Sequence, residues 1–485
     1  MVVEILGSRL FAPYFGSSTY VWSALIGVIL ASLSVGYYLG GRRADVNPSR
    51  KELSRILVLA GSSVAVIPFL APYMAGLALL SGYRLGPLVY GVILFSLPSL
   101  LFGMVPPYTI KLATKDLKVV GSVAGDLYAL STVGSITGTL LSGFVLIPLF
   151  PVSWIFVGVT LLLYAVSLMV WAHSREILTG AAVAAIIAYA CLQANAEEVY
   201  HQNETVVYER YTPYQRILVV DSADGNARTM RLDSSHSGSI NLETGLTEYE
   251  YINFFELPFL LHPNITSVYM VGEGTGVGAA QITRGHPHVK VVVTEIDPTV
   301  HDVAVEYFGF SESDNVEVRL GDSRQLLKES GERYSLAIVD AFNSVYSIPT
   351  HLTTREFFAE VKKHLEDGGV VEVNALSTMD EQSMFLQSLC KTIQSEFRNV
   401  YIYGVDPSAD KSRPQNVIMV ASDRPLERPA RDELTAYATP LFNETKLDWM
   451  LENSVGFDCS NGIVLADDYC PAEYLMEPVV EKAFA

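Results

Sequence analysis

Long apolar runs in the first 195 residues constrain this 485-residue chain more than any other feature. Each run is long enough for a helix to cross a hydrocarbon core of about 30 Å. Half of all residues are hydrophobic, which is more than a soluble enzyme of this length needs. We expect six full spans, at residues 19–41, 55–80, 86–106, 121–149, 152–172 and 177–193. The sequence therefore predicts a multi-span α-helical membrane domain.

The opening segment, residues 1–16, resembles the end of one more helix but is too short to cross alone. Its two charges, Glu4 and Arg9, either pair inside the helix bundle or lie at the membrane interface. Small residues recur in the spans, as at Gly134, Gly138 and Gly143. These predict close helix packing in lipid.

Charge changes sign after residue 195. The first 195 residues hold 11 Lys and Arg against 6 Asp and Glu, whereas the rest of the chain holds 22 against 46. An acidic soluble part repels nucleic acid, so we expect no nucleic-acid partner and a preference for cationic small molecules. Plain solubility is the alternative reason for the acidity.

Four cysteines lie far apart, without a CxxC motif or a Cys/His cluster. This spacing predicts no metal site and unpaired, buried thiols. Cys459 and Cys470 could form a disulfide if their segment faced an oxidising compartment.

The soluble part divides into two regions with different sequence patterns. Residues 196–262 form a linker and a small β-domain, in which 205–233 alternates around Asp224 and Gly225, typical of a two-residue hairpin turn. Residues 263–485 alternate short apolar strands with helical lengths, which predicts a doubly wound, Rossmann-type α/β sheet. We expect its strands near 267–272, 290–295, 315–319, 335–340, 368–374, 399–404 and 416–421.

The first of these strands runs into glycines at every second position. Gly272, Gly274 and Gly276 let the backbone turn sharply and approach a ligand, and Thr275 lies among them. Glu295, at the end of the second strand, can accept both hydroxyls of a ribose. A dinucleotide fingerprint would need a further glycine where the chain has valine, so we favour a single nucleoside.

The next two strands also end in acids. Asp322, followed by Ser323, can accept the exocyclic amine of adenine, or it is a helix N-cap. Asp340 is placed to accept a proton from a nucleophile, or it caps a turn. Because ligands bind at the carboxyl ends of such strands, these residues predict a class I methyltransferase-like site for a sulfonium nucleoside.

With these residues in hand, the soluble part resembles the polyamine aminopropyltransferases, the spermidine synthase family, in its membrane-fused form. Tyr214-Gln215, Leu232-Asp233 and the segment IPTHLTTREFFAEVKKHLEDGGV at 348–370 carry the resemblance beyond the strand ends. The resemblance implies Asp340 as the proton acceptor. The residues that it implies for the donor are Gln215, Gly272, Gly274, Thr275, Gly276, Glu295, Asp322, Ser323 and Pro349. Those that it implies for the acceptor are Tyr251, Asp233 and Asn343.

Several positions depart from the family pattern. Ile252 replaces a histidine, Thr275 an aspartate of the glycine loop, and Asn343 a second pocket aspartate. A diamine would lose charge partners at these neutral positions. Thr275 would also tolerate full S-adenosylmethionine in place of its decarboxylated form.

The leading hypothesis is aminopropyl transfer from decarboxylated S-adenosylmethionine to an amine, with release of methylthioadenosine and without a metal. One alternative is an S-adenosylmethionine-dependent methyltransferase acting on an amine or a lipid-linked acceptor. Another is a polyamine sensor or transporter with a binding-only soluble domain. The resemblance also implies a homodimer, because dimers are common in that family.

Orientation presents a conflict. Basic loops between the first two full spans and after the third lie in the cytoplasm by the positive-inside rule. If 177–193 also crosses, the soluble part lies outside, where a cytosolic nucleoside is missing. We therefore expect a multi-pass protein of the cell membrane with a cytoplasmic transferase domain, and with 177–193 interfacial or re-entrant.

Overall fold

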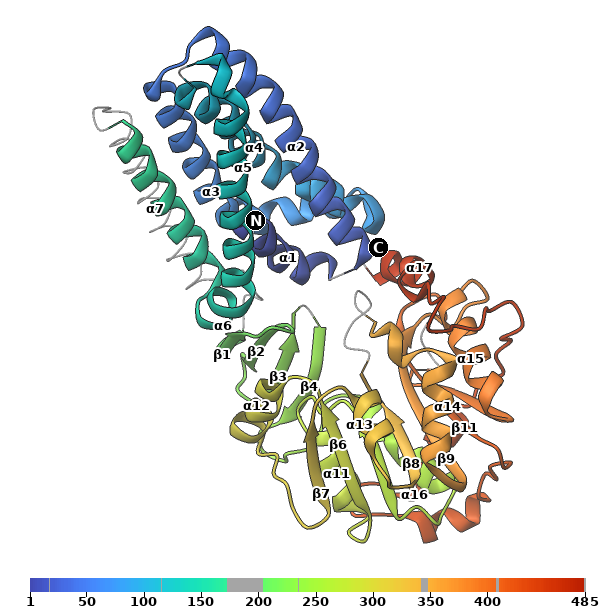
Figure 1. Ribbon diagram of the computed structural model, residues 1–485. Helices are drawn as coiled ribbons and strands as arrows, with labels where there is room; N and C mark the ends of the chain where they lie inside the picture. Colours follow the sequence, from blue (N-terminus) through green and yellow to red (C-terminus); the bar gives the residue numbers. More distant parts are fainter. Residues whose placement is uncertain are drawn as a thin grey trace. The chain divides into compact units, whose positions relative to one another are not determined.

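The computed structural model describes residues 1–16, 18–114, 116–171, 204–233, 235–341, 348–406 and 410–483. The chain divides into two compact units, at 1–202 and 203–485 (Figure 1). The predicted domain boundaries after residues 195 and 262 stay predictions.

The first unit is a helix bundle. Its helices are α1 (Val2–Phe15), α2 (Thr19–Val46), α3 (Arg50–Leu79), α4 (Gly82–Ala113), α5 (Val120–Leu141), α6 (Ile147–Leu149) and α7 (Val152–Val170). Five helical segments within the described residues are long and apolar enough to cross a membrane, at 19–46, 50–79, 84–113, 120–149 and 152–170. The expected helical, multi-span architecture is therefore confirmed, while the sixth expected span, 177–193, lies outside the described residues.

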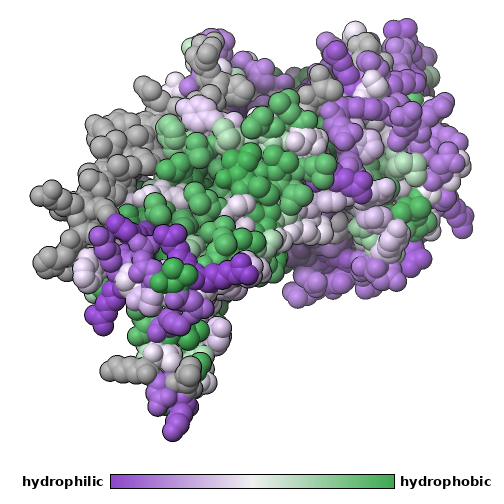
Figure 2. All heavy atoms as spheres, turned by 90° about the horizontal axis from the view of Figure 1, so that it is seen from above, coloured by the Kyte–Doolittle hydropathy of each residue, from purple (hydrophilic) through white to green (hydrophobic). Residues whose placement is uncertain are grey.

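Large apolar side chains cover the outer faces of these helices. Leu30 on α2, Leu97 on α4 and Leu130 on α5 are each more than half exposed. The space-filling view shows a broad apolar area on the surface (Figure 2). Such an area suits contact with lipid, because soluble proteins rarely leave a large apolar patch open to water.

Helices α2 and α4 pack closely against each other. A Cβ on Gly36 would lie 2.2 Å from the carbonyl oxygen of Leu100 and 2.9 Å from the Cα of Gly103. Only glycine permits this approach of two backbones. Within the described residues, a Cβ on Gly138 would lie 3.2 Å from the side chain of Val2, as expected for close packing, whereas a Cβ on Gly134 or Gly143 would meet nothing within 4 Å.

The second unit begins with a small antiparallel sheet. Its strands follow chain order, as β1 (Glu204–Tyr211), β2 (Arg216–Ser222), β3 (Ala227–Leu232) and β4 (Ser235–Asn241). The expected hairpin joins β2 to β3, but four residues link these strands and the prediction of a two-residue turn is wrong. Asp224 explains the longer turn, since its Oδ1 accepts hydrogen bonds from Ser222 Oγ and from the backbone N–H of Asn226.

A seven-stranded sheet follows, with the order β10-β11-β9-β8-β5-β6-β7. The strands are β5 (Ser267–Val271), β6 (Lys290–Glu295), β7 (Val316–Leu320), β8 (Tyr334–Val339), β9 (Leu365–Ser377), β10 (Asn399–Gly404) and β11 (Gln415–Ser422). All seven expected strands are present. The order reverses between β5 and β8, which are parallel neighbours. This switch point opens a ligand crevice at the carboxyl ends of the two strands.

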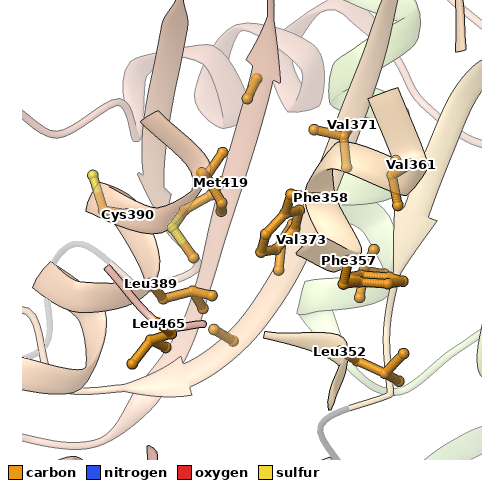
Figure 3. Close-up of a cluster of buried hydrophobic side chains, with 14 of the residues drawn as sticks. Leu352, Phe357, Phe358, Val361, Val371, Val373, Leu389, Cys390, Met419 and Leu465 are labelled. Atoms are coloured by element: carbon orange, nitrogen blue, oxygen red, sulfur yellow. The ribbon is translucent and has the colours of Figure 1, made fainter. Parts of the chain in front are cut away.

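Helices cover both faces of the large sheet. They are α11 (Val277–Gly285), α12 (Pro298–Phe308), α13 (Ser323–Glu329), α14 (Arg355–His364), α15 (Met384–Glu396), α16 (Glu444–Glu452) and α17 (Ala472–Ala483). On β5, Tyr269 and Val271 enter one buried cluster, and Val268 and Met270 enter another. Figure 3 shows part of the first cluster, where side chains of α14 and β9 meet. Burial on both faces confirms the doubly wound fold.

A disulfide joins Cys390 of α15 to Cys459, with Cα atoms 5.9 Å apart, and Cys470 is free. The expectation of unpaired thiols is therefore wrong for Cys390 and Cys459, and the alternative pairing of Cys459 with Cys470 is wrong as well. Cys191 lies outside the described residues. Tertiary folding brings the partners together across 69 residues of sequence. Disulfides are rare in the cytosol, so this bond is at odds with the expected cytoplasmic side.

Candidate active site

The crevice brings the glycine loop against the acid that follows β8. The N–H of Asp340 donates to the carbonyl of Val271, at 2.9 Å. Gly272 has a φ of +94°, and a Cβ there would lie 2.4 Å from the carbonyl oxygen of Asp340. Only glycine satisfies both the conformation and the contact. The structure thus places the predicted donor loop directly beside the predicted proton acceptor.

The rest of the glycine loop packs on β4 of the small sheet. Gly274 and Gly276 also have positive φ, and a Cβ on Gly274 would lie 2.9 Å from the Ser237 hydroxyl. Thr275 is buried, and a Cβ on Gly238 would lie 2.5 Å from its hydroxyl oxygen. The side chain of Thr275 therefore fills the space between the loop and the small sheet.

Glu295 is held firmly at the end of β6. Its two carboxylate oxygens accept hydrogen bonds from the backbone N–H groups of Asp297, at 2.9 Å, and Glu273, at 3.2 Å. Burial raises the pKa of Glu295, and these two bonds oppose that rise. The Thr212 hydroxyl donates to Asp297 at 2.6 Å, so the turn that carries Gln215 lies against the same strand end. The structure thus brings Gln215 and Glu295 into one region.

Asp322 caps the first turn of α13. Its carboxylate accepts a hydrogen bond from the N–H of Gln325 and lies 2.9 Å from Nε2 of His351. The N-cap alternative is thus observed, although the cap leaves the carboxylate at the rim of the sheet. Ser323 turns inward, since its hydroxyl accepts from Thr294 at 2.7 Å. A nucleoside could therefore meet Ser323 through its backbone but not through its hydroxyl.

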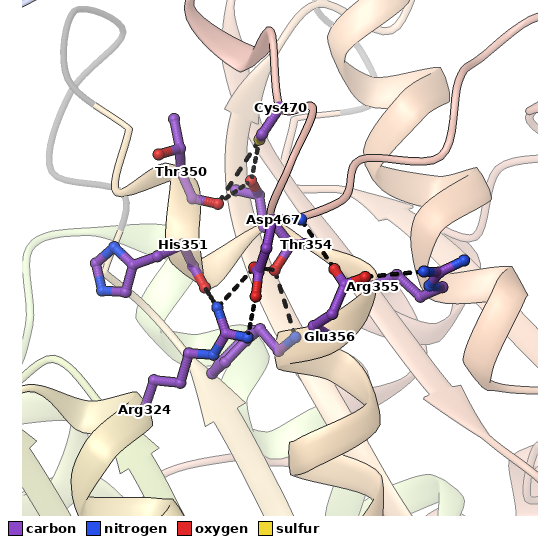
Figure 4. Close-up of polar contacts among 10 residues, drawn as sticks. Arg324, Thr350, His351, Thr354, Arg355, Glu356, Asp467 and Cys470 are labelled. Atoms are coloured by element: carbon purple, nitrogen blue, oxygen red, sulfur yellow. Dashed lines mark hydrogen bonds and ion pairs between the residues drawn. The ribbon is translucent and has the colours of Figure 1, made fainter.

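The C-terminal tail supports this rim from behind. The guanidinium of Arg324 binds both carboxylate oxygens of Asp467, at 2.8 and 2.7 Å, and the Thr354 hydroxyl donates to the same carboxylate (Figure 4). The hydrogen bonds from Arg324 lower the pKa of Asp467 to about 2. Pro349 immediately precedes η5 (Thr350–Leu352), whose loop is part of this network.

A chain of amides orients Asp340. Asn374 of β9 donates to its carboxylate at 2.8 Å, and Asn416 of β11 donates to the side-chain oxygen of Asn374 at 3.0 Å. The second bond fixes which end of the Asn374 amide faces Asp340. Burial raises the pKa of Asp340 to about 6, against the opposing effect of Asn374. Sequence reasoning missed both asparagines, although a polar residue inside the apolar strand β9 was a signal.

The structure describes two of the three predicted acceptor residues. Tyr251 lies on α9 (Glu250–Asn253), and burial together with the charge of Asp340 raises the pKa of its phenol well above the usual range. Asp233, with a φ of +54°, accepts a hydrogen bond from the N–H of Arg216 at 3.0 Å in the small sheet. Asn343 lies outside the described residues. The described part of the chain contains no group of three His, Cys, Asp or Glu side chains that could hold a metal.

Together, the sheet order and the strand-end residues define a transferase of the class I methyltransferase-like fold, preceded by a small β-sheet. A comparison with protein families matches residues 250–408 to the spermine/spermidine synthase domain. The second unit is therefore a transferase enzyme that carries a spermine/spermidine synthase domain and is similar to the polyamine aminopropyltransferases.

Curated relatives agree over much of the second unit. A polyamine aminopropyltransferase of Vibrio vulnificus is 26% identical over 246 residues, which are 49% of this chain and 79% of the relative. A probable polyamine aminopropyl transferase of Bifidobacterium longum is 27% identical over 294 residues, or 58% and 64% of the two chains. The crystal structure of spermidine synthase from Thermotoga maritima is 19% identical, with a TM-score of 0.42 and coverage of 50% and 83%.

Proposed function

We propose that the second unit transfers an aminopropyl group from decarboxylated S-adenosylmethionine to an amine acceptor and releases methylthioadenosine. The observation that carries this proposal is the position of Asp340. This carboxylate lies at the switch point of the sheet, touches the glycine loop through its backbone, and has a pKa of about 6. It is therefore ionised at neutral pH and close to the range that favours a general base.

The donor would be held by the strand ends on one side of the crevice. Glu295 accepts the ribose hydroxyls, and Asp322 accepts the adenine amine, in exchange for its present contact with His351. The glycine loop allows close approach of the backbone. A donor bound in this way would direct the carbon beside the sulfonium toward Asp340, and the acceptor would enter on the side of Asp340.

Asp340 then prepares the nucleophile. An alkylamine has a pKa of about 10, as in lysine, so it arrives protonated and unreactive. The carboxylate removes one proton, and the nitrogen lone pair forms a bond to the carbon next to sulfur. The C–S bond breaks, and its electrons neutralise the sulfonium as methylthioadenosine leaves. Alignment of the two substrates contributes up to about 7–11 kcal/mol to such a step.

Thr275 supports a second candidate, methyl transfer from full S-adenosylmethionine. This residue is neutral and buried at the position where the family has an acid. Without that acid, the loop lacks one charge partner for the ammonium of an aminopropyl donor. The two candidates differ in the donor and in the group transferred, while Asp340 would take the proton in both.

Mass spectrometry of products separates the candidates. The purified full chain in detergent is incubated with each sulfonium donor and a panel of mono- and diamines. We expect products that gain an aminopropyl group only with the decarboxylated donor. Products that gain a methyl group would contradict aminopropyl transfer, and binding without any product would contradict both enzymatic proposals. Asp314→Asn, an exposed acid on the same unit, is the matched control for Asp340→Asn.

A further inference from the structure

Glu372 is a fully buried carboxyl in the middle of β9. Neither of its side-chain oxygens has a hydrogen-bond partner among the described residues. A buried polar group without a partner costs about 1–3 kcal/mol, and more if it is charged. The residues around it in the strand are valines, which would pack there without this cost. The carboxyl therefore needs an explanation beyond packing.

Strand geometry places Glu372 on the same face of the sheet as Asn374, near Asp340. Asn374, which donates to Asp340, is two residues further along β9 and so points to the same face of the sheet. Val339 of β8 pairs with Val373 of β9, and Asp340 follows Val339 directly as Asn374 follows Val373. Strand spacing then separates the Cα atoms of Glu372 and Asp340 by roughly 8 Å.

The electrostatics agree with this placement. Burial raises the pKa of Glu372 well above the usual range, and the charges of Asp340 and Glu256 raise it further. Glu256 already pairs with His286 at 2.8 Å, and Asp340 already has Asn374. Tyr403 of β10, the other titratable group that senses Glu372, has its own pKa raised by burial to about 12 and stays neutral. Glu372 is thus the member of this buried acidic row that lacks a partner.

We propose that Glu372 is a specificity residue that receives the non-reacting ammonium group of the acceptor and so favours diamines over monoamines. The inference rests on the proposed amine transfer. The family has a histidine and an aspartate where this sequence has the neutral residues Ile252 and Asn343. Glu372 would supply a carboxylate in place of that missing charge. Binding of the cation ionises the carboxyl, and its proton leaves to solvent.

Isothermal titration tests the proposal on the full chain in detergent, with 1,4-diaminobutane and n-butylamine as probes. We expect the wild type to bind the diamine about 10- to 100-fold more tightly, the value of one hydrogen bond to a charged group. Glu372→Gln should abolish this preference while leaving n-butylamine binding unchanged. The wild type should also release more protons on binding the diamine, when measured in buffers of different ionisation enthalpy.

Glu366→Gln, an exposed acid at the start of the same strand, is the matched control and should behave as the wild type. No diamine preference in the wild type would overturn the proposal, as would a preference that survives Glu372→Gln. Glu372→Leu provides a second variant and should melt at or above the wild-type temperature, since it removes an unpartnered polar group. Equal turnover of both amines would refute the proposed role of Glu372 but not the proposed transfer. Selective binding of the diamine without any product would refute the proposed transfer but not the role of Glu372.

Discussion

The pH dependence of turnover follows from the environment of Asp340. Its pKa of about 6 means that the carboxylate is half protonated at that pH and about nine-tenths protonated one unit lower. We therefore expect kcat/KM to fall about tenfold per pH unit below 6. The amine stays protonated throughout this range, because its own pKa is about 10, and so adds no break near 6. Asp340→Asn should remove the acid limb and lower kcat by about 10²- to 10⁴-fold.

Steady-state kinetics from pH 4.5 to 9 provide the assay, with the product quantified by mass spectrometry. Asn374→Ala provides a second test. It removes the hydrogen bond that lowers the pKa of Asp340, so the acid limb of the pH profile should move to higher pH. Asp314→Asn should leave both the rate and the limb in place. Turnover by Asp340→Asn within threefold of the wild type would refute the assignment of the general base.

Three further predictions concern the supports of the site. Gly276→Ala should weaken donor binding and destabilise the unit by about 1–3 kcal/mol in thermal melts, because its φ is +73° and the new Cβ would lie 2.4 Å from a phenylalanine ring. Gly309→Ala is the control and should cost less stability, because Gly309 has a similar φ but open space around it. Cys390→Ser opens a link across 69 residues and should destabilise the unit by up to about 4 kcal/mol in non-reducing denaturation, unlike Cys470→Ser. Asp467→Asn should cost about 1 kcal/mol near pH 7, because Asp467 is half exposed although its partner Arg324 is buried. The contribution of the carboxylate is present above about pH 4 and disappears toward pH 2, so the stabilities of the two proteins should converge there.

Hydropathy and periodicity predicted the secondary structure well, because each strand and helix of the second unit carries its own pattern. The turn after β2 is one exception, because local hydrogen bonds of Asp224 lengthen it. Helices α16 and α17 are another, because no helix was expected after residue 396. Five helices that are long and apolar enough to cross a membrane were equally predictable from the length and apolarity of their segments. Their contacts were not, because a glycine on a helix shows no sign of which neighbour it will meet. Gly36 packs against a backbone, whereas a Cβ on Gly134 would meet none of the described residues within 4 Å, although both glycines lie in similar apolar runs.

The strand-end residues of the site were predictable because parallel strands deliver their carboxyl ends to one edge. The residues that tune these groups come from elsewhere in the sheet and were missed. Asn374 and Asn416 reach Asp340 through strand neighbours whose register the sequence does not reveal. The pairing of Cys390 with Cys459 was missed for the same reason, since it joins a helix to a distant segment of the tail.

The contact between Gly238 and Thr275 imposes an order on evolutionary change. Any side chain added at 238 would collide with the β-branched residue at 275, so the glycine must persist while threonine occupies the loop. A lineage that enlarged position 238 would first have to shrink position 275. Gly238, on β4, and Thr275, in the loop after β5, should therefore show sign epistasis, because a larger residue at 238 is tolerated only after position 275 has become smaller.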